Sequence, residues 1–243
     1  DGDEALITRS GNRSFVAEQF RMIRANLQFV IGKVEKPVIL LTSSFSGEGK
    51  SFASTNIGGV MSITGKKTVI LELDIRKPKI TKDLALEKQK GITNFLMGNA
   101  TLEELPVQVA DMNNLYVIQC GPIPPNPAEL LMDSKLDQMF LWIKKHFDIV
   151  IIDSAPVGLV SDSLILARFA DCTLYVVRQE YTLKKQIGLI NELYAEGKFP
   201  NMLLLLNDIK AKKGYGGYYG YGYGYGYGYG YGYKQGSGYF LEK

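Results

Sequence analysis

The chain has 243 residues, of which 46% are hydrophobic and 22% are charged, and its net charge at pH 7 is +3. This length suffices for one sizeable α/β core, and the small net charge excludes the basic stripe of a nucleic-acid binding protein. Cys120 and Cys172 stand in apolar segments, which is typical of buried reduced thiols in a cytosolic protein. No apolar run reaches the ~20 residues of a membrane helix. Because the chain starts at Asp1 without Met, we expect a soluble fragment of a longer protein, and a preceding membrane segment stays open.

The first predicted element is an amphipathic helix over 14–31, where apolar side chains recur at helical spacing and Glu18, Arg21 and Arg24 share another face. Beyond it, short apolar runs alternate with amphipathic segments. The apolar runs predict buried strands over 38–42, 68–73, 115–119, 148–152, 173–177 and 202–206. The other segments predict one helix that ends near residue 63, and further helices over 127–132, 134–146, 161–169 and 182–196.

This alternation predicts an α/β fold in which a mostly parallel central sheet is flanked by helices on both faces. We expect the α/β domain to occupy 1–213. Ligands of such sheets bind beyond the carboxyl ends of the strands, so the loops that follow the strands are the first place to look for chemistry.

The remaining segment, 214–243, consists almost entirely of Gly and Tyr up to residue 239. It lacks the aliphatic residues of a core, and its glycines raise the entropic cost of ordering, so we predict a disordered tail. A flexible or self-associating Gly/Tyr segment is one interpretation of its role. Its eleven tyrosines are Tyr215, Tyr218, Tyr219, Tyr221, Tyr223, Tyr225, Tyr227, Tyr229, Tyr231, Tyr233 and Tyr239.

A phosphate-binding turn is predicted at 44–51, between the first strand and the next helix. Glycines in that position let backbone N–H groups surround phosphate oxygens, and the helix N-terminus adds its positive dipole end. Lys50 would reach the β- and γ-phosphates of a nucleotide, and Ser51 would coordinate Mg²⁺. Ser44 stands where the usual pattern has its first glycine, so a Gly-rich helix start without a ligand is the alternative. The predicted nucleotide-binding residues are Ser46, Gly47, Glu48, Gly49, Lys50, Ser51 and Phe52.

Carboxylates stand at the ends of two predicted strands. Asp153 follows an apolar run and would hold Mg²⁺ directly or through water. Glu72 and Asp74 point to the same side, because strand side chains alternate, and they could bind metal or accept a proton. The alternative for Asp74 is that it caps a helix and pairs with Arg76. The expected catalytic residues are Lys50, Glu72, Asp74 and Asp153, and the expected metal ligands are Ser51, Asp74 and Asp153.

Several motifs that the sequence lacks narrow the range of possible enzyme classes. The single histidine, His146, is predicted at a helix end, which disfavours a Ser-His-acid hydrolase. The sequence has no His-Arg-Asp catalytic loop and no Asp-Phe-Gly, so it is not a eukaryotic-type kinase. It also lacks an Asn-Lys-x-Asp guanine reader. Asn207, at the end of the last predicted strand, is a candidate for contact with adenine.

Several motifs occur in a fixed order along 14–243. They are Glu18-x-x-Arg21-x-x-Arg24, the loop at 46–51, Leu73-Asp74-Ile75-Arg76-Lys77-Pro78, Pro124-Pro125-Asn126-Pro127-x-Glu129-Leu130-Leu131, Asp153-Ser154-Ala155-Pro156 and the terminal tyrosines. This ordered set resembles the bacterial tyrosine kinases (BY-kinases), the cytoplasmic catalytic domains of polysaccharide co-polymerases. The family usually has two aspartates in its second acidic motif, whereas here Glu72 stands at the first position and Asp74 at the second.

The resemblance implies a P-loop fold of the MinD/ParA type, use of ATP and Mg²⁺, and autophosphorylation of the terminal tyrosines in trans. It implies a homo-oligomeric ring with Glu18, Arg21 and Arg24 at the subunit contact. An octamer is one ring size that the resemblance suggests. It also implies a membrane-embedded activator or the chain's own N-terminal transmembrane region, a cognate tyrosine phosphatase, and no nucleic acid. The expected location is the cytoplasmic face of the bacterial inner membrane, and the expected role is regulation of exopolysaccharide or capsule polymerisation and export.

Two other functions stay open at this point. The first is a MinD/ParA-like ATPase that hydrolyses ATP to switch dimerisation. Such proteins carry a lysine early in the loop, where this chain has Phe45, and they have no reason for a tyrosine tail. The second is a non-enzymatic scaffold of an export complex, which is compatible with kinase activity.

Overall fold

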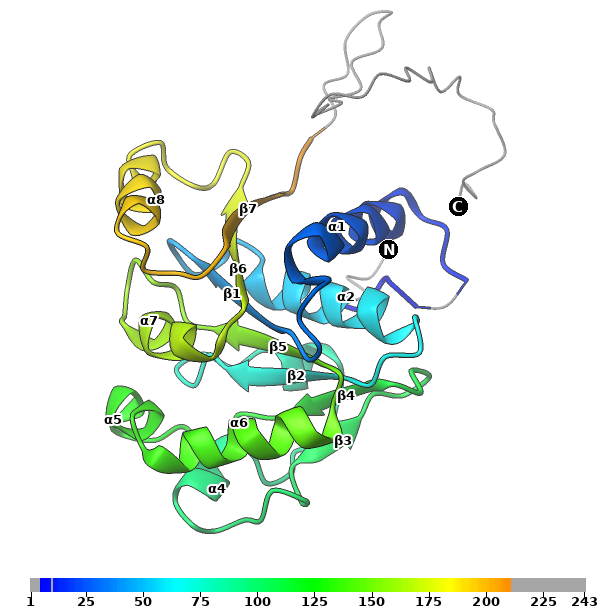
Figure 1. The fold of residues 1–243 in the computed structure, drawn as a ribbon, viewed down its shortest axis with the longest axis vertical. Helices are drawn as coiled ribbons and strands as arrows, with labels where there is room; N and C mark the ends of the chain where they lie inside the picture. Colours follow the sequence, from blue (N-terminus) through cyan, green and yellow to red (C-terminus); the bar gives the residue numbers. More distant parts are fainter. Residues whose placement is uncertain (1–4, 10, 211–243) are drawn as a thin grey trace, which may run out of the picture.

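Apolar runs of three to seven residues form one sheet in the part of the chain that the structure describes. The computed structural model describes residues 5–9 and 11–210 (Figure 1). The Gly/Tyr segment at 214–243, and with it the predicted tail, lies outside these residues. The strands are β1 (Val38–Ser43), β2 (Thr68–Leu73), β3 (Pro106–Gln108), β4 (Leu115–Ile118), β5 (Ile149–Ser154), β6 (Cys172–Arg178) and β7 (Met202–Asn207).

The strand order places β1 near the middle of the sheet. The order is β3-β4-β2-β5-β1-β6-β7, and every neighbouring pair is parallel except β3 and β4. The loops after β1, β2, β5, β6 and β7 therefore leave from the same edge. The helices are α1 (Phe15–Ile31), α2 (Lys50–Ser62), α3 (Ile80–Asp83), α4 (Ile92–Leu96), α5 (Pro127–Leu131), α6 (Ser134–His146), α7 (Asp162–Leu166), the 3₁₀ helix η1 (Ala167–Phe169) and α8 (Gln186–Ala195).

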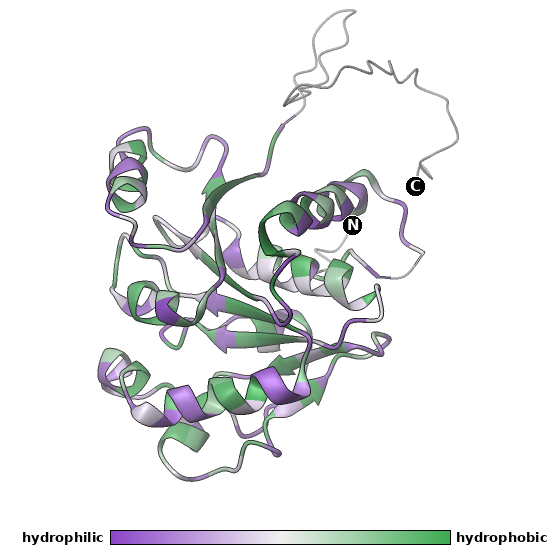
Figure 2. Cartoon of the chain, viewed as in Figure 1, coloured by the Kyte–Doolittle hydropathy of each residue, from purple (hydrophilic) through white to green (hydrophobic). Residues whose placement is uncertain are grey.

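Each buried strand sends alternate side chains into two separate cores, because β side chains point to opposite faces in turn. Ile151 belongs to the core beneath α2 and α1, while its neighbour Ile152 belongs to the core beneath α6, α7 and α8. Figure 1 shows these two layers on either side of the sheet. Hydrophobic residues concentrate on the strands, and α6 shows alternating hydrophobic and hydrophilic bands, as expected of a helix with one face on the core (Figure 2).

Helix α1 packs on α2 rather than directly on most of the sheet. Its N-cap is Ser14, whose hydroxyl accepts a hydrogen bond from the Ala17 amide. Phe20 of α1 meets Phe52 of α2 edge to face, with ring centroids 5.8 Å apart. Among the described residues, no helix combines the length and the apolar character needed to span a bilayer.

The predicted strands agree with the structure to within two residues at each end. The sequence does not predict β3, which has three partly exposed residues and begins at a proline. The helix predicted over 182–196 is wrong in its first turn, since α8 begins at Gln186. The reason is that the Thr182 hydroxyl accepts from the Arg178 amide and donates to Glu48, which holds this segment in a loop.

The close approach of α2 to the sheet depends on Gly58. A Cβ at this position would lie 2.7 Å from Cδ1 and 2.9 Å from Cγ1 of Ile70, beneath the helix. We therefore expect Gly58→Val to lower the free energy of unfolding by about 1–3 kcal/mol, measured by urea denaturation. Gly188→Ala in α8 is the matched control, because nothing lies within 4 Å of its added Cβ. The control should leave stability unchanged or raise it slightly; equal losses in both variants would contradict the packing argument.

Candidate active site

The predicted phosphate-binding turn connects β1 to α2 at the carboxyl edge of the sheet, beside the ends of β5 and β6. Gly47 and Gly49 have φ angles of 91° and 97°, a region that favours glycine. The space at Gly49 is also closed, since a Cβ there would lie 2.0 Å from Nδ2 of Asn207. Both glycines are therefore required by the shape of the loop, before any ligand is considered.

Lys50 is buried at the first position of α2. Its ammonium donates a hydrogen bond to the Ser43 hydroxyl at 3.1 Å. Burial lowers the pKa of Lys50, and the negative charges of Asp153, Asp74 and Glu48 oppose that shift. The ammonium thus lies among carboxylates at the sheet edge, where it would meet the oxygens of a bound phosphate chain.

Asp153, near the end of β5, is fully buried and accepts hydrogen bonds from two hydroxyls of α2. The Ser51 hydroxyl donates to Oδ2 at 2.8 Å, and the Ser54 hydroxyl donates to Oδ1 at 3.0 Å. Burial raises the pKa of Asp153 to about 7, although Lys50 and the two hydroxyls favour the ionised form. This carboxylate therefore lies in an environment that a cation would stabilise.

Asp74 lies just beyond the end of β2, and its carboxylate accepts from the Lys77 amide at 3.1 Å. Burial raises the pKa of Asp74, while backbone hydrogen bonds from Lys77 and Arg76 and the charge of Lys50 oppose the shift. Asp74 also acts on the pKa of Asp153, so the two carboxylates share one electrostatic environment. The alternative in which Arg76 pairs with Asp74 is wrong, because the Arg76 guanidinium binds Asp162.

Oxygen ligands of this kind fit Mg²⁺. A hydroxyl from Ser51 and carboxylates from Asp153 and Asp74 are the hard donors that the ion prefers. Within 5–9 and 11–210, no group of three or more His, Cys, Asp or Glu side chains is arranged to hold a metal by itself. In proteins Mg²⁺ is usually held by one or two carboxylates together with substrate phosphates and water.

Glu72 is placed differently from the other predicted acids. It pairs with Asp153 in the register of β2 and β5, but its carboxylate accepts from the Thr81 amide at 3.1 Å, the Thr81 hydroxyl at 2.6 Å and the Cys120 amide at 3.1 Å. These contacts join the end of β2 to the start of α3 and to the chain after β4. Glu72 is not among the groups that shift the pKa of Lys50.

Side chains from the ends of β6 and β7 and from the loop after β6 support the phosphate-binding turn from outside. Arg178 donates to the Gly47 carbonyl at 2.9 Å and Tyr181 donates to the Ser46 carbonyl at 2.9 Å. Asn207, predicted to contact adenine, donates its amide to the Glu48 carbonyl at 3.0 Å. Sequence reasoning missed Arg178 and Tyr181, because nothing in their local pattern indicates a contact 131 to 135 residues away.

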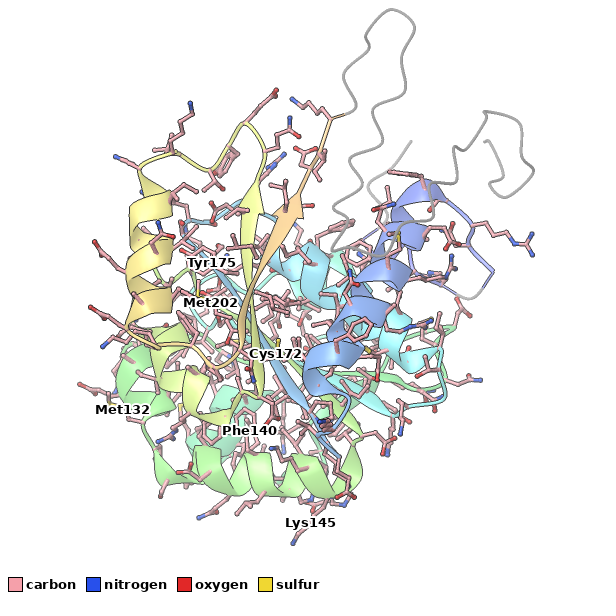
Figure 3. All side chains as sticks on the ribbon, turned by 45° about the horizontal axis from the view of Figure 1, so that its top comes forward. Met132, Phe140, Lys145, Cys172, Tyr175 and Met202 are labelled. Carbon is pink, nitrogen blue, oxygen red and sulfur yellow. The ribbon has the colours of Figure 1, made fainter. Side chains whose placement is uncertain are left out.

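Ser44, which stands in place of the first glycine, is buried beneath the turn. Its hydroxyl shares a hydrogen bond of 2.9 Å with the Tyr175 hydroxyl, and Figure 3 shows Tyr175 in the interior along β6. A Cβ at Gly158 would lie 2.4 Å from the Ser44 carbonyl oxygen, so the loop after β5 also closes on this residue. The serine is therefore accommodated by a hydroxyl partner from the next strand.

Relatives of known name share most of this chain. It is 33% identical over 216 residues to the tyrosine-protein kinase YwqD of Bacillus subtilis, a match that covers 88% of this chain and 91% of the relative. The chain belongs to the bacterial tyrosine-protein kinases. Tyrosine-protein kinase CpsD of Streptococcus agalactiae is 33% identical over 204 residues, covering 84% of the kinase described here and 88% of CpsD. A putative tyrosine-protein kinase in the cps region of Klebsiella pneumoniae is 30% identical over 220 residues, which are 88% of this chain and 30% of that protein.

Solved structures confirm the P-loop fold that the resemblance implies. The chimerical protein CapA2B2 has a TM-score of 0.78 and 29% identity, covering 86% of this kinase and 92% of that chain. The kinase domain of Escherichia coli ETK has a TM-score of 0.72 and 26% identity, covering 82% and 79%. The septum site-determining protein MinD of Pyrococcus horikoshii, with a TM-score of 0.58, 18% identity and coverage of 70% of both chains, shares the fold. No protein-family model matches the chain.

The kinase's predicted subunit-contact residues all have partners within the chain. Arg21 forms an ion pair with Glu18 on α1 and also donates to the Asn12 carbonyl. Arg24 donates to the Val60 carbonyl of α2 at 2.9 Å. The Arg24 contact joins α1 to α2, and Val16, Met22 and Phe29 of α1 are exposed, Phe29 to 90%.

Asp153 makes the stability of the metal-free kinase depend on pH. Its folded-state pKa of about 7 lies above the ordinary value of 3.8, so the contribution of this group to stability is largest below pH 3.8 and is lost as pH rises to about 7. In Asp153→Asn the amide oxygen can accept from one serine hydroxyl and the amide N–H can donate to the other, and the side chain does not titrate. Between pH 5 and 8 we expect the free energy of unfolding of the variant to rise relative to wild type by on the order of 2–3 kcal/mol. Urea denaturation with EDTA measures this; parallel pH profiles would show that Asp153 is not responsible.

Proposed function

We propose that this kinase transfers the γ-phosphoryl group of ATP to the tyrosines at 215–239 and acts in trans between subunits of a ring. The proposal depends on one observation, the convergence of buried Lys50 with Asp153 and Asp74 beside a glycine loop at the sheet edge. Phosphoryl transfer needs mainly positioning and neutralisation of charge, and this arrangement is suited to both.

Each group has a distinct role in the proposed reaction. Bound Mg²⁺ would supply positive charge that neutralises the phosphate oxygens. Ser51, Asp153 and Asp74 would hold it, while the Lys50 ammonium and the loop N–H groups neutralise the phosphate oxygens. The tyrosine oxygen forms a bond to the γ-phosphorus as the bond to the β-phosphate oxygen breaks and ADP leaves.

The acceptor must lose its proton during transfer, because a phenol with a pKa near 10 is protonated at neutral pH. Asp74 is the group that would accept this proton, since burial raises its pKa and it lies on the open side of the cluster, half-buried rather than enclosed. Glu72 would act indirectly, by holding the chain around β2 through Thr81 and Cys120. Asn207 would contact the adenine base while it supports the loop at Glu48.

The tail begins where it can reach this site. Lys210, the last described residue, donates its amide to Gln179 at 3.0 Å and pairs with Glu180 at 2.6 Å, beside the loop that supports the phosphate-binding turn. A Gly-rich chain of ~25 residues spans about 25–30 Å root-mean-square, which is comparable with the width of a small domain. Tyrosines attached at this edge are therefore within reach of a neighbouring subunit's site.

The wider role follows from the relatives. The Klebsiella relative lies in a cps region, which supports regulation of exopolysaccharide or capsule polymerisation and export. That relative is about three times longer than the matched part, which supports a membrane region in the same chain or a separate membrane-embedded activator. Location at the cytoplasmic face of the inner membrane and reversal by a cognate tyrosine phosphatase complete the proposal.

Lys50→Met should abolish phosphotyrosine without loss of the fold. Removing one positioned cation from a water-excluded site costs at least about a hundredfold in rate. Lys66→Met is the control, because this exposed lysine lies in the loop between α2 and β2 and should have no effect. The measurement is phosphotyrosine after phosphatase treatment, repurification and incubation with ATP and Mg²⁺. Wild-type phosphotyrosine in Lys50→Met would reject the proposed site.

The same variant tests transfer in trans. A chain with all eleven tail tyrosines changed to Phe keeps its site but has no tail acceptor. Mixed with Lys50→Met, it should phosphorylate the tail of that inactive chain. Phosphotyrosine in wild type but none in the mixture would mean that transfer occurs in cis.

We further propose that α1 joins the subunits of the ring through its exposed apolar side chains, with Glu18, Arg21 and Arg24 beside them. Met22→Glu with Phe29→Glu should reduce the ring to smaller species in native mass spectrometry, because a charge at a subunit contact opposes burial. Tyr194→Glu is the matched control on α8, where the tyrosine is 70% exposed. Identical oligomers for both variants would exclude α1 from the interface.

Phosphorylation is expected to loosen the same ring. Five phosphates add roughly −8 to −10 charges, which reverses the formal charge of +3. Native mass spectrometry of phosphorylated and dephosphorylated wild type provides the comparison, and rings of equal stability would contradict a role for phosphate in assembly.

A further inference from the structure

An ion pair with one fully buried partner connects the loop that carries Asp74 to α7, the helix that follows β5 and its Asp153. Asp162, the first residue of α7, is fully buried. Its Oδ2 accepts from Nε of Arg76 at 2.8 Å, and its Oδ1 accepts from Nη2 at 3.0 Å. The pair is bidentate, so the two planar groups fix both the distance and the orientation of the loops.

The position of this pair relates it to the chemistry. Arg76 lies two residues after Asp74, on the loop that leaves β2, and Asp162 lies on the segment that leaves β5 after Asp153. Strands β2 and β5 are neighbours, so the segments that follow them start side by side. The ion pair links these two segments at Arg76 and Asp162, beyond the strand ends. The Arg76–Lys77 backbone in turn donates to the Asp74 carboxylate.

The pair is more than a surface contact. A fully buried carboxylate is strongly disfavoured unless it is paired, so Asp162 requires the Arg76 guanidinium. Arg76 is 37% exposed, and among the described residues its guanidinium donates to Asp162, so this contact holds the loop of Asp74 toward α7. If Arg76 were released, the backbone N–H groups that orient Asp74 would lose their anchor.

We propose that Asp162 is a positioning residue for phosphoryl transfer, which holds Arg76 so that the Asp74 and Asp153 carboxylates face one Mg²⁺. Asp162 does not touch substrate or metal in this account. The inference rests on the proposed function for the identity of the metal ligands, and it adds two residues for which sequence analysis gave no such role. Its expected consequence is a change in metal dependence rather than in nucleotide affinity.

Arg76→Gln, Asp162→Asn and the double variant test this proposal. In metal-free protein, amide hydrogen exchange at Lys77 should become about tenfold faster in each single variant, because its acceptor Asp74 is no longer held. With ATP, the Mg²⁺ concentration for half-maximal tightening of nucleotide binding should rise about tenfold, measured by fluorescence of a labelled ATP analogue. Binding of that analogue in EDTA should change less than twofold.

The double variant should be no worse than the more affected single variant, since residues that act through each other are not additive. Arg76→Lys should lie between wild type and Arg76→Gln, because an ammonium keeps the charge but cannot form the bidentate contact. The control is Arg168→Gln, which breaks the exposed pair with Asp137 on α6 and should leave every readout unchanged.

The proposal would be overturned if the single variants lost thermal stability but kept wild-type exchange at Lys77 and wild-type Mg²⁺ dependence. Asp162 would then have a purely structural role. Additive losses in the double variant would also overturn it. If Asp162→Asn fails to fold, the two Arg76 variants decide the question, since Arg76 is partly exposed. Kinase activity in Lys50→Met would reject the proposed function. If Lys50→Met is inactive but Arg76→Gln has wild-type exchange at Lys77 and wild-type Mg²⁺ dependence, only this inference is rejected.

Discussion

The structure depends on burying opposite charges together at the edge of the sheet. Asp153 has no exposed surface and Lys50 is 5% exposed, so neither group is hydrated as it would be in water. The pKa of the carboxylate is raised and that of the ammonium is lowered by burial, which shows that each is disfavoured in its charged form. In the proposed reaction, a bound metal and phosphate chain would place an opposite charge beside each group. Under the proposed function, the burial that disfavours both charges would also strengthen their attraction to a charged ligand.

Parallel strands place these charges without relying on flexible loops. Asp153 faces Leu41 of β1 on one side and Glu72 of β2 on the other, through the backbone register of three adjacent strands. Asp74 lies one residue beyond the end of β2, and Lys50 lies seven residues beyond the end of β1. Because the strands are buried on both faces, the positions of their ends are fixed by two hydrophobic cores at once. The turn itself is then held by Arg178, Tyr181 and Asn207 from the next two strands.

Sequence patterns predicted the elements that are encoded by residues close together in the chain. The buried strands appear as continuous apolar runs, and the glycine loop at 44–51 lies between a strand and a helix, so both could be placed from sequence. Short elements such as β3 carry no usable period. The ion pair between Arg76 and Asp162 spans 86 residues and the contact between Thr182 and Glu48 spans 134, and neither leaves a mark in the local sequence. Strand parity predicted that Glu72 and Asp74 share a side, but parity could not reveal that Thr81 and Cys120 bind the Glu72 carboxylate.

Glu48 illustrates how the fold reconciles a carboxylate with a phosphate-binding loop. A negative side chain among the loop N–H groups would repel the anion that the loop is shaped to hold. The structure turns this side chain away: it is fully buried and accepts from the Phe45 amide at 2.7 Å and from the Thr182 hydroxyl. The carboxylate thereby ties the start of the loop to the segment before α8, and the same contact is what shortens that helix. The Glu48 carboxylate therefore does not face the space where the loop N–H groups would meet a phosphate. Its two hydrogen bonds instead hold the loop against the segment before α8.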